Sequence, residues 1–337
     1  MRNKIFLPAH LSRQQQDLIY LDKNQRELTI EPVYAYIKGE RFRLEHINPV
    51  KDVPPAQSSL LKAMDLMTAP KHWNNLPSLL HGLANAKRKL HADNFLRITR
   101  KAGMAGRPDI LLECARRVDD TRYKLANPEL VAELMYQISS KALKSEWKAK
   151  DTKQALAWAE TVSELLEDER HAGKRHVDGV DDVRVRPEVI GVLLQLSAVW
   201  ATRFYDGKDR DGKVKLYADR LLGSPASWEP DPKRIDPHAA NLYLAHMSPV
   251  LHGMKLAQPI LGESKQLECW IAELETTIEA QKERLLSARP DPKAELVDRG
   301  LVVYHELIGP EAKKVASTKR DEKQMEMEPK TGTETTE

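Results

Sequence analysis

The stretch FLRITRKAGMAGRPDILLECARRV, residues 95–118, decides the fold class. Its apolar residues recur three or four positions apart, as they do on one face of an α-helix. Phe95, Leu96 and Ala102 can face a core, and the letters AGRP then interrupt the pattern with a turn signal. Leu111 and Leu112 supply the apolar face of a second segment. The stretch therefore predicts two helices joined by a short turn, which is a helical hairpin.

The same helical period extends over most of the chain. Several segments begin with proline in their first turn, at RPD, NPE, RPE and DPH, where the missing N–H is harmless. Hydrophobic residues make up 41% of the chain and charged residues 31%, with only 15 glycines, which favours amphipathic helices over strands. We expect an all-α fold, an irregular array of antiparallel helical hairpins. The predicted helices are 58–67, 76–90, 92–103, 107–118, 127–144, 151–171, 186–205, 211–223, 236–256, 264–288 and 292–308.

The N-terminal segment has a different pattern. Ser12 with Gln15 forms a capping-box signal, which predicts a helix over about 12–25. Apolar residues then alternate along 33–44, and Lys38-Gly39 supplies a turn in the middle, so a short β-hairpin is predicted. Since an isolated hairpin is marginally stable in water, it must dock on the helical body or on a partner. Prolines at 49, 54 and 55 mark a linker. We expect four parts: an extension over 1–57, a helical-repeat region with a basic stripe over 58–185, a C-terminal helical region over 186–310 and a disordered tail over 311–337.

Composition limits the class of protein. Cys114 and Cys269 stand 155 positions apart with no Cys/His cluster beside them, so neither a zinc site nor a disulfide framework is expected, and both thiols are predicted on buried helix faces. No run approaches the roughly 18 apolar residues of a membrane span. The first acid is Asp17, after three basic residues, which is the bias of an organelle-targeting segment, although Pro8 interrupts a targeting helix.

Positive charge is concentrated in one region. Residues 71–150 hold 16 Lys and Arg against 8 Asp and Glu, whereas 151–185 hold 5 against 9. Arg97, Arg100 and Lys101 share one helical stripe, and such cations neutralise nucleic-acid phosphates. A solvated helix face is the alternative, with Glu113 and Arg117 as an ordinary i, i+4 pair. The candidate RNA-binding residues are Lys87, Arg88, Lys89, Arg97, Arg100, Lys101, Arg107, Arg116 and Arg117.

KAGMAGRPDILLECARRV resembles the turn and second helix of a pentatricopeptide repeat, a helical hairpin used in organellar RNA metabolism. DTKQALAWAE, from Asp151, is a similar phrase 44 residues later, a spacing longer than the family's repeat, so the resemblance covers 92–170 as two degenerate units. The start NKIFLPAHLS followed by such hairpins is similar to fungal mitochondrial ribosomal and translation-associated proteins. The resemblance implies a component of a ribonucleoprotein in the mitochondrial matrix, and of the mitochondrial ribosome in particular. Such a component would bind rRNA or other RNA through phosphates and would contact neighbouring proteins. Base-by-base reading, which needs several repeats in series, is not expected.

Other motifs carry weaker signals. DGKDRDGKVKLYADR lacks two ligands of a calcium loop, and His171 and His176 have no further ligands nearby. The carboxylates of 164–169 are interpreted as the solvent-exposed C-terminal end of a helix rather than as an acid/base pair. Six tryptophans are expected to be packing anchors rather than base-stacking platforms. We therefore predict a non-catalytic protein without a cofactor or metal. The rivals are a tetratricopeptide-like scaffold or assembly factor without RNA binding, and an enzyme on a helical fold.

Overall fold

The computed structural model describes residues 2–37, 39–172, 182–225, 228–230, 236–288 and 298–309. The chain forms two compact units, Met1–Ile138 with Glu160–Lys174 and Ser139–Ala159 with Arg175–Glu337. The predicted four-part division stays a prediction, and the predicted tail lies outside the described residues, as does His176. In the described parts, no helix combines the length and the apolar character that crossing a bilayer requires.

The first unit begins with short helical elements. A π-helical turn at Arg2–Phe6 precedes α1 (Leu7–Ala9), α2 (Arg13–Tyr20), a 3-10 turn at Asp22–Asn24 and α3 (Gln25–Ile30). The Gln15 N–H donates to the Ser12 hydroxyl at 3.3 Å, and the Ser12 N–H donates to the Gln15 side chain at 3.1 Å. This reciprocal pair satisfies two N–H groups that a helix start leaves without partners, so the predicted capping box is confirmed.

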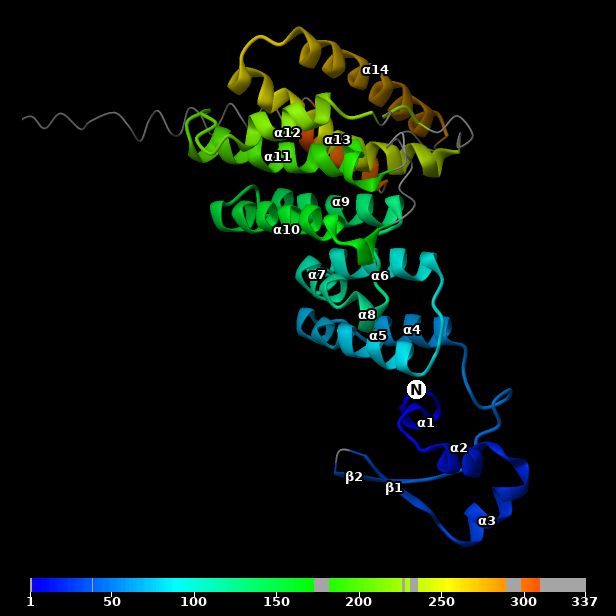
Figure 1. The fold of residues 1–337 in the computed structure, drawn as a ribbon. Helices are drawn as coiled ribbons and strands as arrows, with labels where there is room; N and C mark the ends of the chain where they lie inside the picture. Colours follow the sequence, from blue (N-terminus) through cyan, green and yellow to red (C-terminus); the bar gives the residue numbers. More distant parts are fainter. Residues whose placement is uncertain are drawn as a thin grey trace, which may run out of the picture. The chain divides into compact units, whose positions relative to one another are not determined.

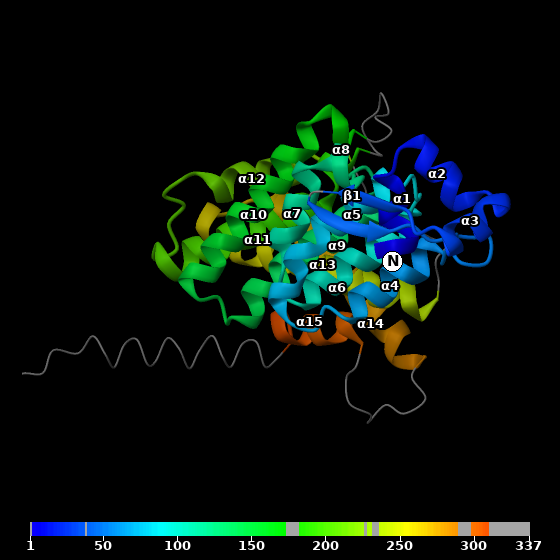
Figure 2. The same cartoon turned by 90° about the horizontal axis from the view of Figure 1, so that it is seen from below.

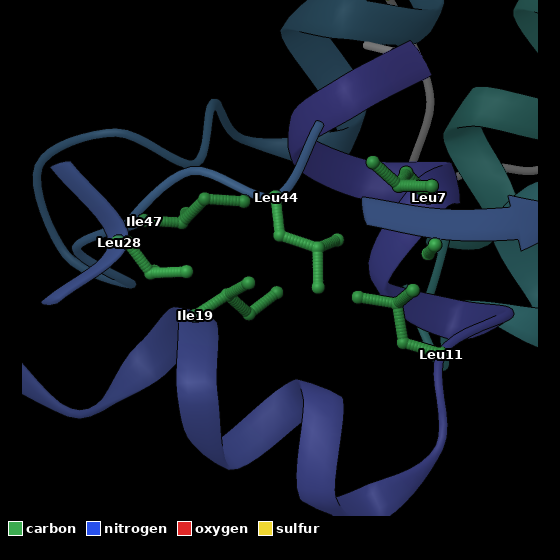
Figure 3. Packing of buried hydrophobic residues seen from close by; sticks show 7 residues of the cluster. Leu7, Leu11, Ile19, Leu28, Leu44 and Ile47 are labelled. Carbon is green, nitrogen blue, oxygen red and sulfur yellow. The ribbon is translucent and has the colours of Figure 1, made fainter. Parts of the chain in front are cut away.

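The predicted β-hairpin is present. Strands β1 (Tyr34–Ile37) and β2 (Glu40–Arg43) pair antiparallel, with Tyr34 opposite Arg43. Gly39 in the connecting turn has φ of 84°, a conformation that favours glycine. The hairpin docks on the chain's own N-terminal helices through a cluster of buried apolar side chains (Figure 3). The members of the cluster are Leu7, Leu11, Ile19, Leu28, Ala35, Leu44 and Ile47.

The rest of the first unit is a set of stacked helices (Figure 1). Helix α5 packs on α7 and α8, and α6 packs on α4 and α7. Helices α9 and α10 each contribute residues to both units. The bounds are α4 (Ala56–Asp65), a 3-10 turn (Pro70–Asn75), α5 (Leu76–Asn85), α6 (Ala92–Met104), α7 (Pro108–Arg116), α8 (Val118–Thr121), α9 (Pro128–Lys144) and α10 (Ala149–Glu167), followed by 3-10 turns at Glu169–His171 and Val183–Val185.

The second unit is organised around one long helix. Besides parts of α9 and α10, the second unit contains α11 (Pro187–Phe204), α12 (Lys213–Leu222), α13 (Pro237–Leu261), α14 (Lys265–Ser287) and α15 (Arg299–Leu307). Helix α13 packs against the other four, and α15 is coloured orange-red in Figure 2. A Cβ on Gly253 of α13 would lie 2.7 Å from the Gln195 backbone nitrogen of α11, and one on Gly191 of α11 would lie 2.6 Å from the Val250 side chain. Glycine at these two places lets the helix axes approach closely.

The all-α class is confirmed, and the predicted helices are found with shifted ends. The helix predicted over 12–25 ends at Tyr20, the one predicted over 76–90 ends at Asn85, and residues 292–297 of the last one lie outside the described residues. Helix α13 continues to Leu261 through Pro259, beyond the predicted end at 256. The prediction that Cys269 is buried is wrong, because it stands on the exposed side of α14, where its thiol donates to Glu273 at 3.3 Å. The predicted burial of tryptophan holds fully for Trp73 and Trp147, while the other four are half-buried.

Candidate nucleic-acid interface

Three of the candidate cations lie in the loop between α5 and α6. The Lys87 N–H donates to the Ala84 carbonyl at 2.9 Å and the Arg88 N–H donates to the Leu83 carbonyl at 2.9 Å. These two bonds form a Schellman cap, with Lys87 in the left-handed conformation at φ of 52°. Lys87 and Lys89 are exposed and Arg88 is half-buried. The cap holds three consecutive cations at the carboxyl end of α5, where positive charge is favoured by the helix dipole.

Helix α6 buries one side and exposes Arg97 on the other. The buried side consists of Asn94, Ile98, Thr99, Ala102 and Gly103. Within the described part of the chain, no carboxylate forms an ion pair with Arg97. Its guanidinium is therefore available to a partner outside the chain.

Arg100 does not continue the outward stripe that its spacing predicts. Its Nε donates to Glu133 Oε2 of α9 at 3.2 Å, and the Glu133 side chain is fully buried. Gln137 Nε2 donates to the other Glu133 oxygen at 2.9 Å. A buried carboxylate requires a paired charge and hydrogen bonds, so Arg100 serves the interior of the first unit.

Lys101 and Arg107 are also engaged within the chain. Lys101 pairs with Asp65 at the end of α4. Arg107 donates from Nε and Nη2 to the Asp109 carboxylate and from Nη2 to Asn74 Oδ1 at 2.7 Å. The hydrogen-bonded Asp109 carboxylate raises the pKa of Arg107 above its usual range. Arg107 thus connects the start of α7 to the 3-10 turn at Pro70–Asn75, whereas the Lys101–Asp65 pair is exposed and water screens it.

The end of α7 carries the last two candidates. Arg116 is exposed and forms no ion pair with any described residue. Arg117 pairs with Asp120 at 3.3 Å, not with Glu113 as its spacing predicts. Both side chains of this pair are more than 40% exposed, so water screens the interaction and the pair holds the guanidinium only weakly.

The structure thus divides the nine candidates into two groups. Four are paired within the chain: Arg100, Lys101, Arg107 and Arg117. Five have no ion pair in the described ranges: Lys87, Arg88, Lys89, Arg97 and Arg116. RNA contact stays a prediction for all nine, and the second group can offer a full charge to phosphate.

Sequence reasoning missed two further cations on the same unit. From the last residue of α8 onward, burial alternates over 121–125, with Thr121, Tyr123 and Leu125 buried and Arg122 and Lys124 exposed. The Tyr123 hydroxyl lies 2.5 Å from Thr99 Oγ1 of α6, and the Leu125 N–H donates to His171 Nδ1 at 3.1 Å. The period of two in TRYKL is the signal that could have identified this alternation of buried and exposed side chains, although Arg122 adopts the left-handed conformation at φ of 61° and the segment is not a strand.

The motifs considered for metal or acid/base chemistry have structural roles. His171 is buried, and burial lowers its pKa. Arg170 binds the Asp168 carboxylate and holds its pKa at about 2, so that carboxylate does not exchange protons near neutrality. Asp209 of the DGKDRDGK turn accepts from the Val214 and Lys215 N–H groups and caps α12. In the described residues no cluster of three metal-ligating side chains occurs.

Comparison with known proteins assigns the chain to a family. The family described as mitochondrial ribosomal protein mS27 matches residues 1–306. The small ribosomal subunit protein mS27 of Neurospora crassa is 29% identical over 263 residues, which cover 73% of this chain and 65% of the relative. The matched region thus spans slightly less than two thirds of that curated relative. Because the family match extends over nearly the whole chain, this chain belongs to the mitochondrial ribosomal protein mS27 family.

Proposed function

We propose that this chain is a non-catalytic structural component of the small subunit of the mitochondrial ribosome and that it acts in the matrix. The family match over residues 1–306 is the observation that carries this proposal. The name of the Neurospora crassa relative, a small ribosomal subunit protein, supports the choice of subunit.

We infer that rRNA phosphates are contacted by the cations of the first unit that have no internal ion pair. These are Lys87, Arg88, Lys89, Arg97 and Arg116, with Arg122 and Lys124 as additions. Each phosphate that such a cation neutralises releases a condensed counter-ion, so binding weakens with salt. Arg100 and Arg107 contribute less, because each is paired with a carboxylate and partly buried. Lys101 and Arg117 stand in exposed pairs that water screens, so their contribution is intermediate.

We also propose that the segment 92–170 consists of two degenerate pentatricopeptide-like hairpins. The packing of α6 on α7 across the AGRP turn supports the first of these two hairpins. The second would be α9 with α10. Two hairpins are too few to read a base sequence, so the array would recognise the shape and backbone of RNA.

Sedimentation of a mitochondrial lysate tests the assignment to the ribosome. With magnesium present, the tagged chain is expected to co-migrate with the small subunit on a sucrose gradient. Removal of magnesium unfolds rRNA and should shift the chain to the top of the gradient. A chain that stays at the top in magnesium would overturn the proposal, and co-migration with the large subunit would correct the choice of subunit.

A charge-matched pair of variants tests the RNA-contacting surface. The triple variant Lys87→Gln, Arg88→Gln, Lys89→Gln removes three cations of the α5–α6 loop. The control Lys148→Gln, Lys150→Gln, Lys153→Gln removes three exposed cations around the start of α10. For the loop variant, the slope of log affinity against log salt should fall by about 0.7 to 0.9 for each phosphate that is no longer neutralised. Equal slopes for the two variants would mean that net charge, and not this surface, governs binding.

A protein scaffold or assembly factor without RNA binding is the second candidate. The internal pairing of four of the nine candidate cations favours it. Helix α14 also presents an outward side, beyond its buried Leu267, Ile271 and Leu274, that could receive a protein neighbour. Capture of a peptide or protein partner that does not respond to salt, together with no measurable affinity for RNA, would support this candidate over the first.

A further inference from the structure

The two faces of the N-terminal hairpin have different compositions. Cross-strand pairing puts Tyr34 opposite Arg43 and Tyr36 opposite Arg41. Because side chains alternate along a strand, these four residues share one face. Ala35, Ile37, Glu40 and Phe42 occupy the other face, and we call the first the outer face and the second the inner face.

The inner face is occupied by the protein itself. Ala35 belongs to the buried cluster of Figure 3, and Ile37 and Phe42 pack against that cluster. Glu40, the acid within the two strands, pairs with Arg2, whose guanidinium also lies 5.0 Å from the centre of the Phe42 ring. The apolar side chains of the inner face are therefore packed against the protein, and the one carboxylate of the two strands is paired there.

The outer face is exposed and carries no acid. Tyr36 is 72% exposed and Tyr34 36%, and both arginines are exposed. The Arg41 guanidinium lies 3.6 Å from the centre of the Tyr34 ring, a contact that orients it on the sheet without neutralising its charge. Neither Arg41 nor Arg43 forms an ion pair with any residue that the structure describes. Apart from Glu40 on the inner face, the nearest acids in sequence are Glu31 and Glu45, which lie beyond the strand ends.

Packing within the chain does not explain this composition. A tyrosine ring that is 72% exposed adds little to the stability of a two-stranded sheet, and two unpaired arginines on the same surface repel each other. Aromatic rings and guanidinium groups on an open sheet are the groups that single-stranded nucleic acids require. Unpaired bases stack on aromatic rings, while cations hold the flanking phosphates.

We propose that the outer face of the hairpin binds an unpaired stretch of RNA. One base stacks on the Tyr36 ring, and Arg41 and Arg43 bind the phosphates on either side of that nucleotide. A protein strand is a poorer occupant, because strand addition uses the edge of a sheet and would leave the outer-face cations without partners. A duplex is also a poorer occupant, since its bases are already stacked within the helix and cannot reach the ring.

This inference concerns a second surface, separate in sequence from the cations of α5 to α8. Those cations offer only charge, which does not distinguish single from double strands, whereas Tyr36 requires an unstacked base. The two surfaces therefore make different demands on the same RNA. Failure of the hairpin proposal would leave the ribosomal assignment intact, because that assignment is tested by sedimentation.

The test uses the full chain with fluorescent single-stranded and double-stranded RNA of equal length and sequence. The variant Tyr36→Ala should weaken single-stranded binding by about 5- to 150-fold, the range for removal of one base–aromatic stack. Tyr36→Phe keeps the ring and should bind as the parent does. Duplex affinity should change less than twofold in both variants. Arg41→Gln with Arg43→Gln should weaken binding and reduce its salt dependence.

Three results would overturn the proposal. One is unchanged single-stranded affinity of Tyr36→Ala, and another is an equal loss of duplex binding. The third comes from a photo-crosslinking amino acid placed at position 36 in assembled subunits. Crosslinks to protein and none to RNA would identify a protein as the occupant of the outer face. The same crosslinker at Leu66, which is 77% exposed on the same unit, gives the background level. Equal melting temperatures of parent and Tyr36→Ala exclude loss of folding as the cause.

Discussion

Arg100 illustrates what residue spacing cannot reveal. Its position relative to Arg97 and Lys101 predicts an outward charge, yet its guanidinium pairs with the buried carboxylate of Glu133, which stands 33 positions later on another helix. Local periodicity indicates which side of α6 is polar, but it does not identify a partner contributed by a distant segment. Lys101 pairs with Asp65, and its spacing fails to reveal this for the same reason.

We predict that Arg100→Gln lowers the free energy of unfolding by about 2 to 4 kcal/mol, because it removes a positive charge that pairs with the buried Glu133 carboxylate. Urea denaturation of the full chain measures the change. Arg97→Gln on the same helix is the control and should cost less than about 0.5 kcal/mol. Adding Glu133→Gln to Arg100→Gln should restore part of the stability. Equal effects of the two single variants would show that the pair does not support the fold.

His252 makes stability depend on pH. The Ser139 hydroxyl donates to Gln195 Oε1 at 2.6 Å, and Gln195 Nε2 lies 3.2 Å from His252 Nδ1. Because the amide nitrogen can only donate, His252 Nδ1 accepts this hydrogen bond, and the ring is neutral when it does so. Burial and the nearby Arg203 lower the pKa of His252 to about 4 from 6.5. Between pH 4 and pH 6.5, His252 is therefore protonated in the unfolded chain and neutral in the folded chain. Stability should be full above pH 6.5 and fall by about 1 to 3 kcal/mol on the way to pH 4. In His252→Gln this part of the pH dependence should disappear from thermal melts.

At the scale of elements, the helices are largely predictable because each carries its own start signal. Ser12 with Gln15 and the first-turn prolines of α7, α9, α11 and α13 mark boundaries locally. Helix α8 is not predictable in this way, since four residues are too short to show a period. The exposure of Cys269 depends on which side of α14 faces α13, and that choice is made by packing with a separate helix.

The packing of α11 on α13 yields a prediction of its own. Gly253→Ala should lower stability by about 1 to 3 kcal/mol despite the higher helix propensity of alanine, because the new methyl would meet the Gln195 backbone at 2.7 Å. Gly191→Ala should cost less, since it meets the Val250 side chain, which can shift. Calorimetric melting of both variants compares them. A Gly253→Ala protein that melts above the parent would contradict the close approach of the two helices.

For the whole molecule, the sequence was sufficient to predict the class of protein. The predicted mitochondrial ribosomal class is confirmed by the family match over residues 1–306. The candidate surface was predicted less well, because a count of charges over 71–150 does not separate cations that hold the fold from cations that are free. The outer face of the hairpin was missed for another reason: alternation identified the strands, but the register that puts Tyr36 beside Arg41 is a property of the fold.

The division into units predicts how fragments behave. Val162, Leu166 and His171 are buried residues of the first unit, although they follow a segment that belongs to the second. A fragment of residues 1–138 lacks all three and should melt at a lower temperature and less cooperatively than a fragment of residues 1–174. Circular dichroism melts of the two fragments test this. Identical melts would show that 160–174 adds nothing to the first unit.

That path of the chain also constrains its biogenesis. Synthesis and transport through a membrane pore both proceed from one end of a polypeptide, so the amino-terminal hairpin and its helices can form early. The first unit nevertheless stays incomplete until residue 174 has emerged, because its last segment, 160–174, follows residues 139–159 of the second unit. A nascent chain stalled before that point should depend on chaperones, and release from them should coincide with the arrival of the returning helix.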